Sequence, residues 1–262
     1  MIYRLKSLLF LASLMIGGPV VAQDIGGVFD MSVMTGTASM DPVIEQSREM
    51  AIRKEAQDPL PGRSRSLPIT RSLKSAFMSE PRPSSENAMR DRSTLTYRPS
   101  AAVRRANFAS FVERLRAIDP EDAVQLEKDL NGNVMDAGEA QLKPHGLTST
   151  NVADAATTYL ATAWFGARGR VDDPSPAQTR ALQSQLASAM LSSTEFQSAS
   201  DAQKQEVAEA MILQSIMIAQ HVEAARDRPE YMASVRTAVA NGARNAFGID
   251  VNSMALTDAG LQ

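Results

Sequence analysis

The sequence predicts an all-α fold, an irregular or orthogonal bundle of about seven helices around a long central helix. Three observations favour this class. Apolar residues recur at spacings of three and four over most of residues 97–262, which is the period of a helix. Aromatic residues make up only 5% of the chain, whereas a β-sandwich is rich in aromatic and β-branched residues. No stretch has a convincing strand pattern.

The predicted central helix covers Ala202–Arg226, the longest and most apolar helical pattern after the N-terminal segment. Ser200 followed by Gln203 has the spacing of a capping box, and Pro229 lies beyond the end. At 1.5 Å per residue the helix would be roughly 37 Å long. Two adjacent apolar stripes cover more than half of its girth and include Val207, Met211, Ile212, Ile216, Ile218 and Val222. We therefore expect neighbouring helices to enclose it, and Ile216→Asp to unfold the domain.

Residues 1–22 have the pattern of a signal peptide. Arg4 and Lys6 precede an apolar run that Gly17–Pro19 interrupts, and small residues ending at Ala22 form a cleavage site. The run is shorter than the ~20 residues of a membrane span, and no other stretch is long and apolar enough. We expect an exported protein, periplasmic or secreted, with no transmembrane segment after cleavage.

Residues 23–96 are expected to form a disordered or weakly helical arm before a helical domain at residues 97–262. Apolar residues in the arm keep no period, and prolines with Ser and Arg between them interrupt it. Asp41–Ala56 favours one short helix, because Asp41 can cap it and Pro42 suits its first turn. The Arg-rich stretch Arg63–Lys74 is suited to an acidic partner, although interspersed acids favour a solvated linker.

Start and stop signals divide residues 97–262 into helices. Ser100 caps the first, which is expected to reach Ile118, and Pro120 begins the second. Further helices are expected at 134–143, 151–167, 175–191, 194–197, 202–226 and 229–247. Gly248 ends the last of these, and the tail Ile249–Gln262 is expected to lie over the core through Val251, Met254 and Leu256.

Two groups of residues carry a family resemblance. One is Tyr97–Ser100 leading into Arg104, and the other is Gly146-Leu147, Asn151–Ala155, Tyr159-Leu160 and Ala163-Trp164. The region from Tyr97 to the C-terminus resembles a family of uncharacterised exported all-helical proteins from proteobacteria, a domain of unknown function, with the arm outside it. The resemblance implies an export signal, a variable arm and a helical domain, and it implies no activity.

Composition excludes several classes of function. The net charge of −3 provides no general attraction for nucleic acid or an anionic membrane. The absence of cysteine excludes disulfides, thiolate metal sites and cysteine nucleophiles. A membrane-active amphipathic protein is disfavoured, because the basic residues do not gather on one helix.

The sequence predicts no metal and no cofactor. His145 precedes a glycine in a loop, which is typical of a solvated or helix-capping imidazole. His221 lies on the central helix without a second ligand on the same face, as expected for a boundary residue with one hydrogen bond. Asp129–Asn133 opens like a calcium loop, but Val134 and Ala140 stand where that loop needs Gly and Glu.

Four side chains are candidates for binding: Asp154, Tyr159, Trp164 and His221. Asp154 lies in the first turn of its helix, where capping and the helix dipole already explain a carboxylate. Trp164 is more often a core anchor than a ligand platform. Paired-acid glycosidase chemistry using Glu139, Asp154 or Glu209 stays open, because sequence spacing does not show which acids face each other.

The sequence therefore predicts an exported helical binding protein without a catalytic motif, whose arm recruits or tethers a protein partner. The alternative is a cell-envelope hydrolase that cleaves peptidoglycan with acidic residues in a cleft of the bundle.

Overall fold

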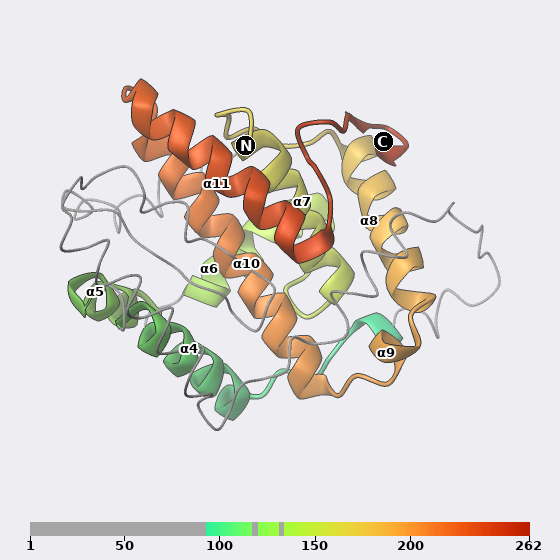
Figure 1. Cartoon of the computed structure of the whole chain (residues 1–262). Coiled ribbons are helices and arrows are strands. Elements are labelled where there is room, and N and C mark those ends of the chain that lie inside the picture. Colours follow the sequence, from blue (N-terminus) through green and yellow to red (C-terminus); the bar gives the residue numbers. More distant parts are fainter. Residues whose placement is uncertain (1–92, 117–119, 131–133) are drawn as a thin grey trace, which may run out of the picture.

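The computed structural model describes residues 93–116, 120–130 and 134–262. The predicted signal peptide at 1–22, the arm from residue 23 to 92 with its helix Asp41–Ala56, and the turn Asn131–Asn133 lie outside the described residues. Within them the chain is almost entirely helical, and the predicted all-α class is confirmed (Figure 1). None of the described helices is long and apolar enough to cross a membrane.

The helices begin and end within a few residues of the expected positions. In chain order they are α4 (Ala101–Arg116), α5 (Pro120–Leu130), α6 (Val134–Leu142), the short 3-10 helix η4 (Lys143–His145), α7 (Val152–Gly166), α8 (Pro176–Leu191), α9 (Thr194–Gln197), α10 (Asp201–Ala224) and α11 (Pro229–Phe247). Two short strands, β1 (Leu256–Thr257) and β2 (Gly260–Leu261), pair antiparallel in the tail.

Side-chain caps fix the start of three of the long helices. The Ser200 hydroxyl accepts from the backbone N–H of Gln203, whose side chain accepts from the Ser200 N–H, so the predicted capping box of α10 is present. The box expected at Ser175 is present on α8. The side chain of Asn151 accepts from the first backbone N–H groups of α7. These local contacts explain why the boundaries were readable from the sequence.

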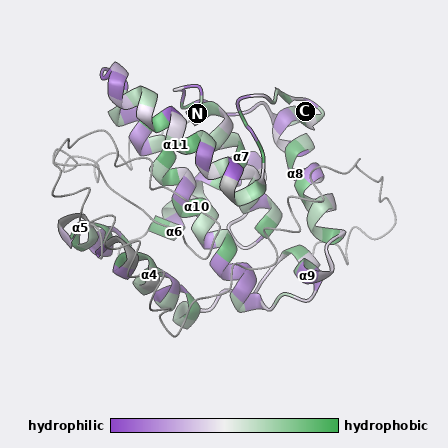
Figure 2. Ribbon diagram, viewed as in Figure 1, coloured by the Kyte–Doolittle hydropathy of each residue, from purple (hydrophilic) through white to green (hydrophobic). Residues whose placement is uncertain are grey.

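The centre of the bundle is a pair of helices. α10 packs lengthwise against α7, α8 lies against α7, α11 contacts both, and α4 covers the first half of α10 (Figure 1). The predicted enclosure of α10 is confirmed, and Figure 2 shows hydrophilic residues at its first turn and hydrophobic ones through its middle. α7 is enclosed even more completely, since all its residues except Thr158, Thr162 and Trp164 are buried.

A glycine allows the central pair to approach closely near the end of α7. A Cβ atom on Gly166 would lie 2.7 Å from Cγ2 of Ile218 on α10 and 3.4 Å from Cγ1 of Val239 on α11. A side chain at this position would require the Ile218 side chain to shift. Gly166 therefore permits the close packing of α7 against α10.

One expected core residue lies elsewhere. Ile216 was placed in the second apolar stripe of the central helix, but it is only partly buried and lines a cavity. Its neighbours Met211 and Ile212 are buried as expected. The prediction that Ile216→Asp unfolds the domain is therefore wrong in its premise, because a charge at this position has access to the open space of the cavity.

The C-terminal tail packs on α7 and α8, as expected from its apolar residues. Val251 and Leu256 are buried and Met254 is partly buried. The indole N–H of Trp164 donates to the Met254 carbonyl at 2.9 Å, and the Arg168 guanidinium donates to the same carbonyl at 3.1 Å. The tail is thus held by side chains of α7 and of the turn that follows it, which bind its backbone.

The contacts of the bundle extend a few residues before Tyr97. Leu95 is buried, and the Lys204 ammonium on α10 donates to the Thr94 carbonyl at 2.7 Å. The Tyr97 hydroxyl donates to the Ser149 carbonyl at 3.0 Å. This segment connects the start of α10 to the loop before α7.

Candidate functional site

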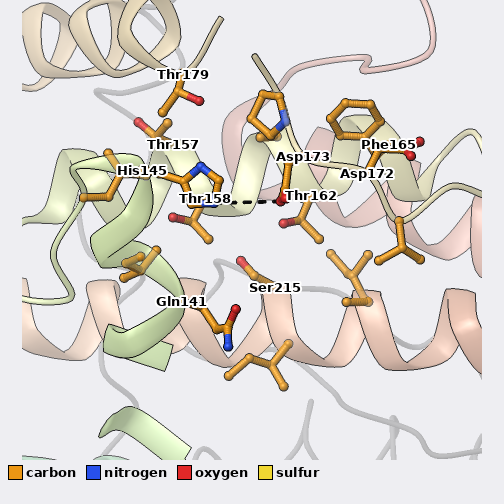
Figure 3. Close-up of a pocket in the computed structure, with 18 of the residues that line it drawn as sticks. Gln141, His145, Thr157, Thr158, Thr162, Phe165, Asp172, Asp173, Thr179 and Ser215 are labelled. Atoms are coloured by element: carbon orange, nitrogen blue, oxygen red, sulfur yellow. Dashed lines mark ion pairs between the residues drawn. The ribbon is translucent and has the colours of Figure 1, made fainter. Parts of the chain in front are cut away.

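A cavity of about 130 Å³ lies between the two central helices and the segment that precedes α8 (Figure 3). α7 and α10 form its floor and one side. α6 with η4 forms a second side, and residues 170–174 pass over the remaining one. The cavity therefore lies where the core pair is not covered by another long helix.

Most of the cavity wall is apolar. Leu142 and Leu147 contribute from the α6 side, Phe165 from α7, and Ile212 and Ile218 from α10. All five are buried in the core cluster. Small-molecule sites typically combine such an apolar wall with a few convergent polar groups, and the remaining wall of this cavity supplies those groups.

Four hydroxyl groups on the wall share one arrangement. Each donates its proton to the backbone carbonyl four residues earlier in its own helix or at the helix cap. The donations are Thr157 to Ala153 at 2.7 Å, Thr158 to Asp154 at 2.9 Å, Thr179 to Ser175 at 3.0 Å and Ser215 to Met211 at 2.8 Å. Because a hydroxyl has one proton and two lone pairs, these groups keep acceptor capacity.

Charged side chains border the more exposed side of the cavity. The imidazole Nε2 of His145 lies 4.0 Å from Oδ1 of Asp173, an approach that Figure 3 marks across the cavity. Next to it the Arg170 guanidinium donates to the Asp172 carboxylate at 2.6 Å. Asp172 is about half exposed and Asp173 is much less so. The segment 170–174 thus brings two carboxylates and one guanidinium to the cavity.

The environment of His145 differs from the one expected. The sequence suggested a solvated or helix-capping imidazole in a loop, but His145 ends the short helix η4 and is partly buried against the cavity. The turn at Gly146, which has a φ of 73°, directs the chain away after it. The contact with Asp173 joins two distant loops, so nothing local in the sequence indicates it.

None of the four predicted site residues lines the cavity. Asp154 is buried at the start of α7, where its carboxylate accepts from the Thr148 N–H at 2.9 Å and from the Gln183 amide at 2.8 Å. Tyr159 is buried on the other side of α7 and stacks on Phe247, with ring centroids 5.6 Å apart. Burial raises the pKa of the Tyr159 hydroxyl above its ordinary value.

The other two predicted residues also have structural partners. Trp164 is covered by the guanidinium of Arg168, 3.8 Å from the ring centroid, and anchors the C-terminal tail. Nδ1 of His221 lies 2.6 Å from the hydroxyl of Tyr231 on α11. Burial lowers the pKa of His221 to about 4, so the imidazole is neutral at neutral pH and accepts the hydroxyl proton.

The three acids considered for hydrolysis occupy different places. Glu139 accepts from the Ser149 backbone N–H at 2.6 Å, and Asp154 lies at the start of α7. Glu209 is buried between α4 and α10. None of the three lines the cavity, whose carboxylates are those of Asp172 and Asp173. Within the described residues, no three His, Asp or Glu side chains gather so as to hold a metal ion.

Glu209 belongs to a group that we call the sealed cluster, composed of Ser100, Arg104, Asn107, Gln205 and Glu209. The carboxylate of Glu209 accepts from Arg104 at 2.7 Å, from Asn107 at 2.9 Å and from Gln205 at 2.9 Å. The Gln205 amide also accepts from the Ser100 N–H at 2.8 Å and donates to the Ser100 carbonyl at 3.0 Å. The cluster joins the start of α4 to α10.

Comparison with known proteins places the chain in a family without assigning a function. The model of a family of unknown function, DUF6683, matches residues 6–262. The chain belongs to this family. The match includes residues before Tyr97, so the expectation that the arm lies outside the family region is wrong. No curated protein and no solved structure matches the chain.

The sequence contained one signal for the cavity that the pattern analysis did not use. Thr157, Thr158 and Thr162 interrupt a helix otherwise made of small and apolar residues. Threonine loses side-chain freedom in a helix and is a weak helix former, so three in one buried helix suggest a polar space beside it. His145, Asp173 and Ser215 carry no comparable signal.

Proposed function

We propose that this chain is an exported binding protein that holds a small, mainly apolar ligand in the cavity between α7 and α10. The observation that carries the proposal is the cavity itself, with its apolar wall and its polar groups directed at one space. A ligand of matching shape would bury apolar wall that is otherwise in contact with water, which favours binding.

The exported location is part of the same proposal. It is supported by residues 1–22, where a positive start, an apolar run and a small-residue cleavage site follow one another. We propose in addition that the arm recruits a protein partner in the periplasm or outside the cell, with the Arg-rich stretch Arg63–Lys74 as its charged contact. Pull-down from envelope extracts with residues 23–262, compared with residues 93–262, tests the arm.

The binding test uses small probes and a blocked cavity. Titration of the protein with toluene or 1-hexanol, followed by ligand-observed NMR and by the melting temperature, is expected to give saturable binding with a Kd between micromolar and millimolar. This range corresponds to ~4–8 kcal/mol of binding free energy, which lies below the ceiling of ~1.5 kcal/mol per non-hydrogen atom for very small ligands.

Ala161→Leu is the variant that decides the location of binding. Ala161 is buried on α7 and lines the cavity, so a leucine there fills the space that the probe needs. Ala202→Leu is the matched control, because it makes the same change at an exposed position on α10. Binding that survives Ala161→Leu unchanged would place the probe elsewhere and contradict the proposal.

Peptidoglycan hydrolysis has less support than binding. The acids Glu139, Asp154 and Glu209 each accept hydrogen bonds from protein donors, and none of them faces the cavity. Zymography on cell-wall material tests this alternative directly. A clearing zone that is lost in a Glu209→Gln variant with unchanged melting temperature would favour hydrolysis over the proposed binding role.

A further inference from the structure

Two neutral side chains on the cavity wall, Gln141 on α6 and Thr162 on α7, have no hydrogen-bond partner within the part of the chain that the structure describes. Both are partly buried, and Figure 3 shows them beside the same space. An amide carries two donated protons and an acceptor oxygen, and a hydroxyl carries one proton and two lone pairs. These two side chains therefore have both protons and lone pairs to offer a ligand.

Four further hydroxyls on the wall add acceptors. They donate their protons to backbone carbonyls, and they are Thr157, Thr158, Thr179 and Ser215. Each keeps lone pairs for a ligand proton. With the protons of Gln141 and Thr162, the wall thus matches a ligand group that both donates and accepts. A group that only accepts leaves the acceptors of the wall unused.

The charged side chains of the wall, in contrast, have partners within the protein. The Arg170 guanidinium donates to the Asp172 carboxylate at 2.6 Å. The Asp173 carboxylate lies 4.0 Å from the imidazole of His145 and has a further interaction within the chain. A charged ligand would have to leave water although no opposite charge on this wall is free to receive it, which is costly. The wall therefore favours a neutral ligand over a cation or an anion.

We propose that the cavity selects an uncharged ligand that carries one hydroxyl or amide group on a small apolar body. The polar group is bound by Gln141 and the threonine hydroxyls of α7, and the body packs on Phe165 and Ile218. A cavity of about 130 Å³ is close to the ~150 Å³ at which an engineered cavity takes up benzene, so the body has about six non-hydrogen atoms. This inference rests on the proposed binding function and adds the chemical class of the ligand.

The test compares four probes of similar size. 1-Hexanol, its isomer 1-methoxypentane, hexylamine and hexanoate are titrated into the protein at about pH 7.5 by isothermal calorimetry, where the amine is a cation and the acid an anion. 1-Hexanol is expected to bind at least about tenfold more tightly than either ion, because the ions lose their hydration without a free counter-charge. It is expected to bind about fivefold more tightly than 1-methoxypentane, which has no proton to donate, since a neutral hydrogen bond contributes about that factor.

Two variants separate the acceptors of the wall from its donors. Thr158→Val removes only an acceptor, because the Thr158 proton is donated to the Asp154 carbonyl at 2.9 Å. It is expected to weaken 1-hexanol about fivefold and to change 1-methoxypentane less than about twofold. Gln141→Met removes a donor and is expected to weaken both probes about fivefold. Gln220→Met is the matched control, since Gln220 is also partly buried but lies outside the cavity lining, and it is expected to leave both affinities unchanged.

The outcomes separate the two proposals. Binding of hexylamine or hexanoate as tight as that of 1-hexanol overturns the preference for a neutral ligand while the binding cavity stands. Equal affinity for 1-hexanol and 1-methoxypentane, or equal weakening of both by Thr158→Val, also overturns the inference, since the ligand proton would then make no contribution. An effect of Gln220→Met as large as that of Gln141→Met does the same. Failure of all four probes to bind, at concentrations up to millimolar, overturns the proposed function together with this inference.

Discussion

The sealed cluster and the cavity wall both place polar side chains beside α10. They differ in how much hydrogen-bonding capacity is left for a ligand. In the sealed cluster Glu209 accepts from three side chains, and Gln205 bonds to both backbone groups of Ser100. On the cavity wall the hydroxyls donate their protons to backbone carbonyls of their own helices, and their lone pairs remain available as acceptors on the cavity side.

This difference separates a structural role from a binding role. A buried carboxylate with three protein donors has most of its acceptor sites occupied within the protein, and its removal leaves those donors without an acceptor. A hydroxyl bonded within its own helix is satisfied without a ligand and still has an acceptor to offer. The sealed cluster is therefore expected to carry stability, and the cavity wall is expected to carry binding.

The largest contrast is expected from one charge placed on two faces of α10. Met211→Asp buries an unpaired carboxylate among core side chains and is expected to unfold the domain, because that penalty rivals a total stability of ~5–15 kcal/mol. Ile216→Asp puts the same group on the cavity wall, and a loss of about 2 kcal/mol or less is expected. Circular dichroism and urea denaturation measure both. Equal unfolding by the two variants would show that the cavity face is as closed as the core.

Glu209→Ala tests the structural role of the sealed cluster. It removes the acceptor shared by Arg104, Asn107 and Gln205 and is expected to lower the free energy of unfolding by about 3 kcal/mol. Glu223→Ala is the control, since Glu223 pairs with Arg226 at the surface and such pairs contribute ~0–1 kcal/mol. Urea denaturation compares them. Probe binding by the folded Glu209→Ala protein should be unchanged.

His221 and Tyr231 form a third, partly buried polar contact, and the stability it contributes should depend on pH. Burial holds the folded-state pKa of His221 at about 4, below the ~6.5 of an unfolded chain. Between these values the unfolded state binds more protons, so stability is full above pH 6.5 and falls as pH drops toward 4. The loss is expected to be about 2 kcal/mol.

The measurement for His221 is a difference between two proteins, because carboxylates also titrate as pH falls. Urea denaturation of the native chain and of His221→Gln is compared at pH 7.5 and pH 4.5. The glutamine keeps an acceptor for the Tyr231 hydroxyl and does not titrate. The variant should lose less stability than the native chain over this range, and parallel losses would mean that His221 is protonated as easily when folded as when unfolded.

The smallest effect on stability is expected when a hydroxyl is removed from the cavity wall. Thr158→Val removes a hydroxyl bonded to its own helix and should change the free energy of unfolding by less than about 1 kcal/mol. Thr237→Val on α11 is the matched control, since Thr237 donates to the Ala233 carbonyl in the same manner at an exposed site. Thermal denaturation of both should agree, while only Thr158→Val should weaken the binding of 1-hexanol.

The sequence predicted the helices well because their signals are local. The capping boxes at Ser175 and Ser200, and the glycine after α11, act within a single turn of chain and can be read without knowing the fold. The enclosure of α10 followed from an apolar surface wider than one neighbour can cover. The tail also lay where its apolar residues indicated.

The cavity was not predictable because no single segment contains it. His145, at the end of η4, and Asp173, in the segment before α8, come together only through the packing of the bundle, and Ser215 faces the cavity through a rotation of α10 that periodicity does not fix. Ile216 shows the same limit. The sequence correctly assigned it to an apolar stripe of α10, but which residues of that stripe are fully covered depends on where α8 and η4 leave α10 uncovered. Trp164 and His221 also have protein partners that periodicity does not indicate, the Met254 carbonyl in the tail and the Tyr231 hydroxyl on the next helix.

The way in which the C-terminal tail is held predicts which of its positions can vary in sequence among relatives. Trp164, Arg168 and Gln178 hold the tail through the carbonyls of Val251, Met254 and Leu256. Carbonyls are common to every amino acid, so the exposed tail positions such as Asn252 and Ser253 can vary while the buried Val251 and Leu256 stay apolar. Variation at these positions among relatives would then be compatible with an ordered tail, and the conservation to look for is at Trp164 on α7, at Arg168 in the turn after it and at Gln178 on α8.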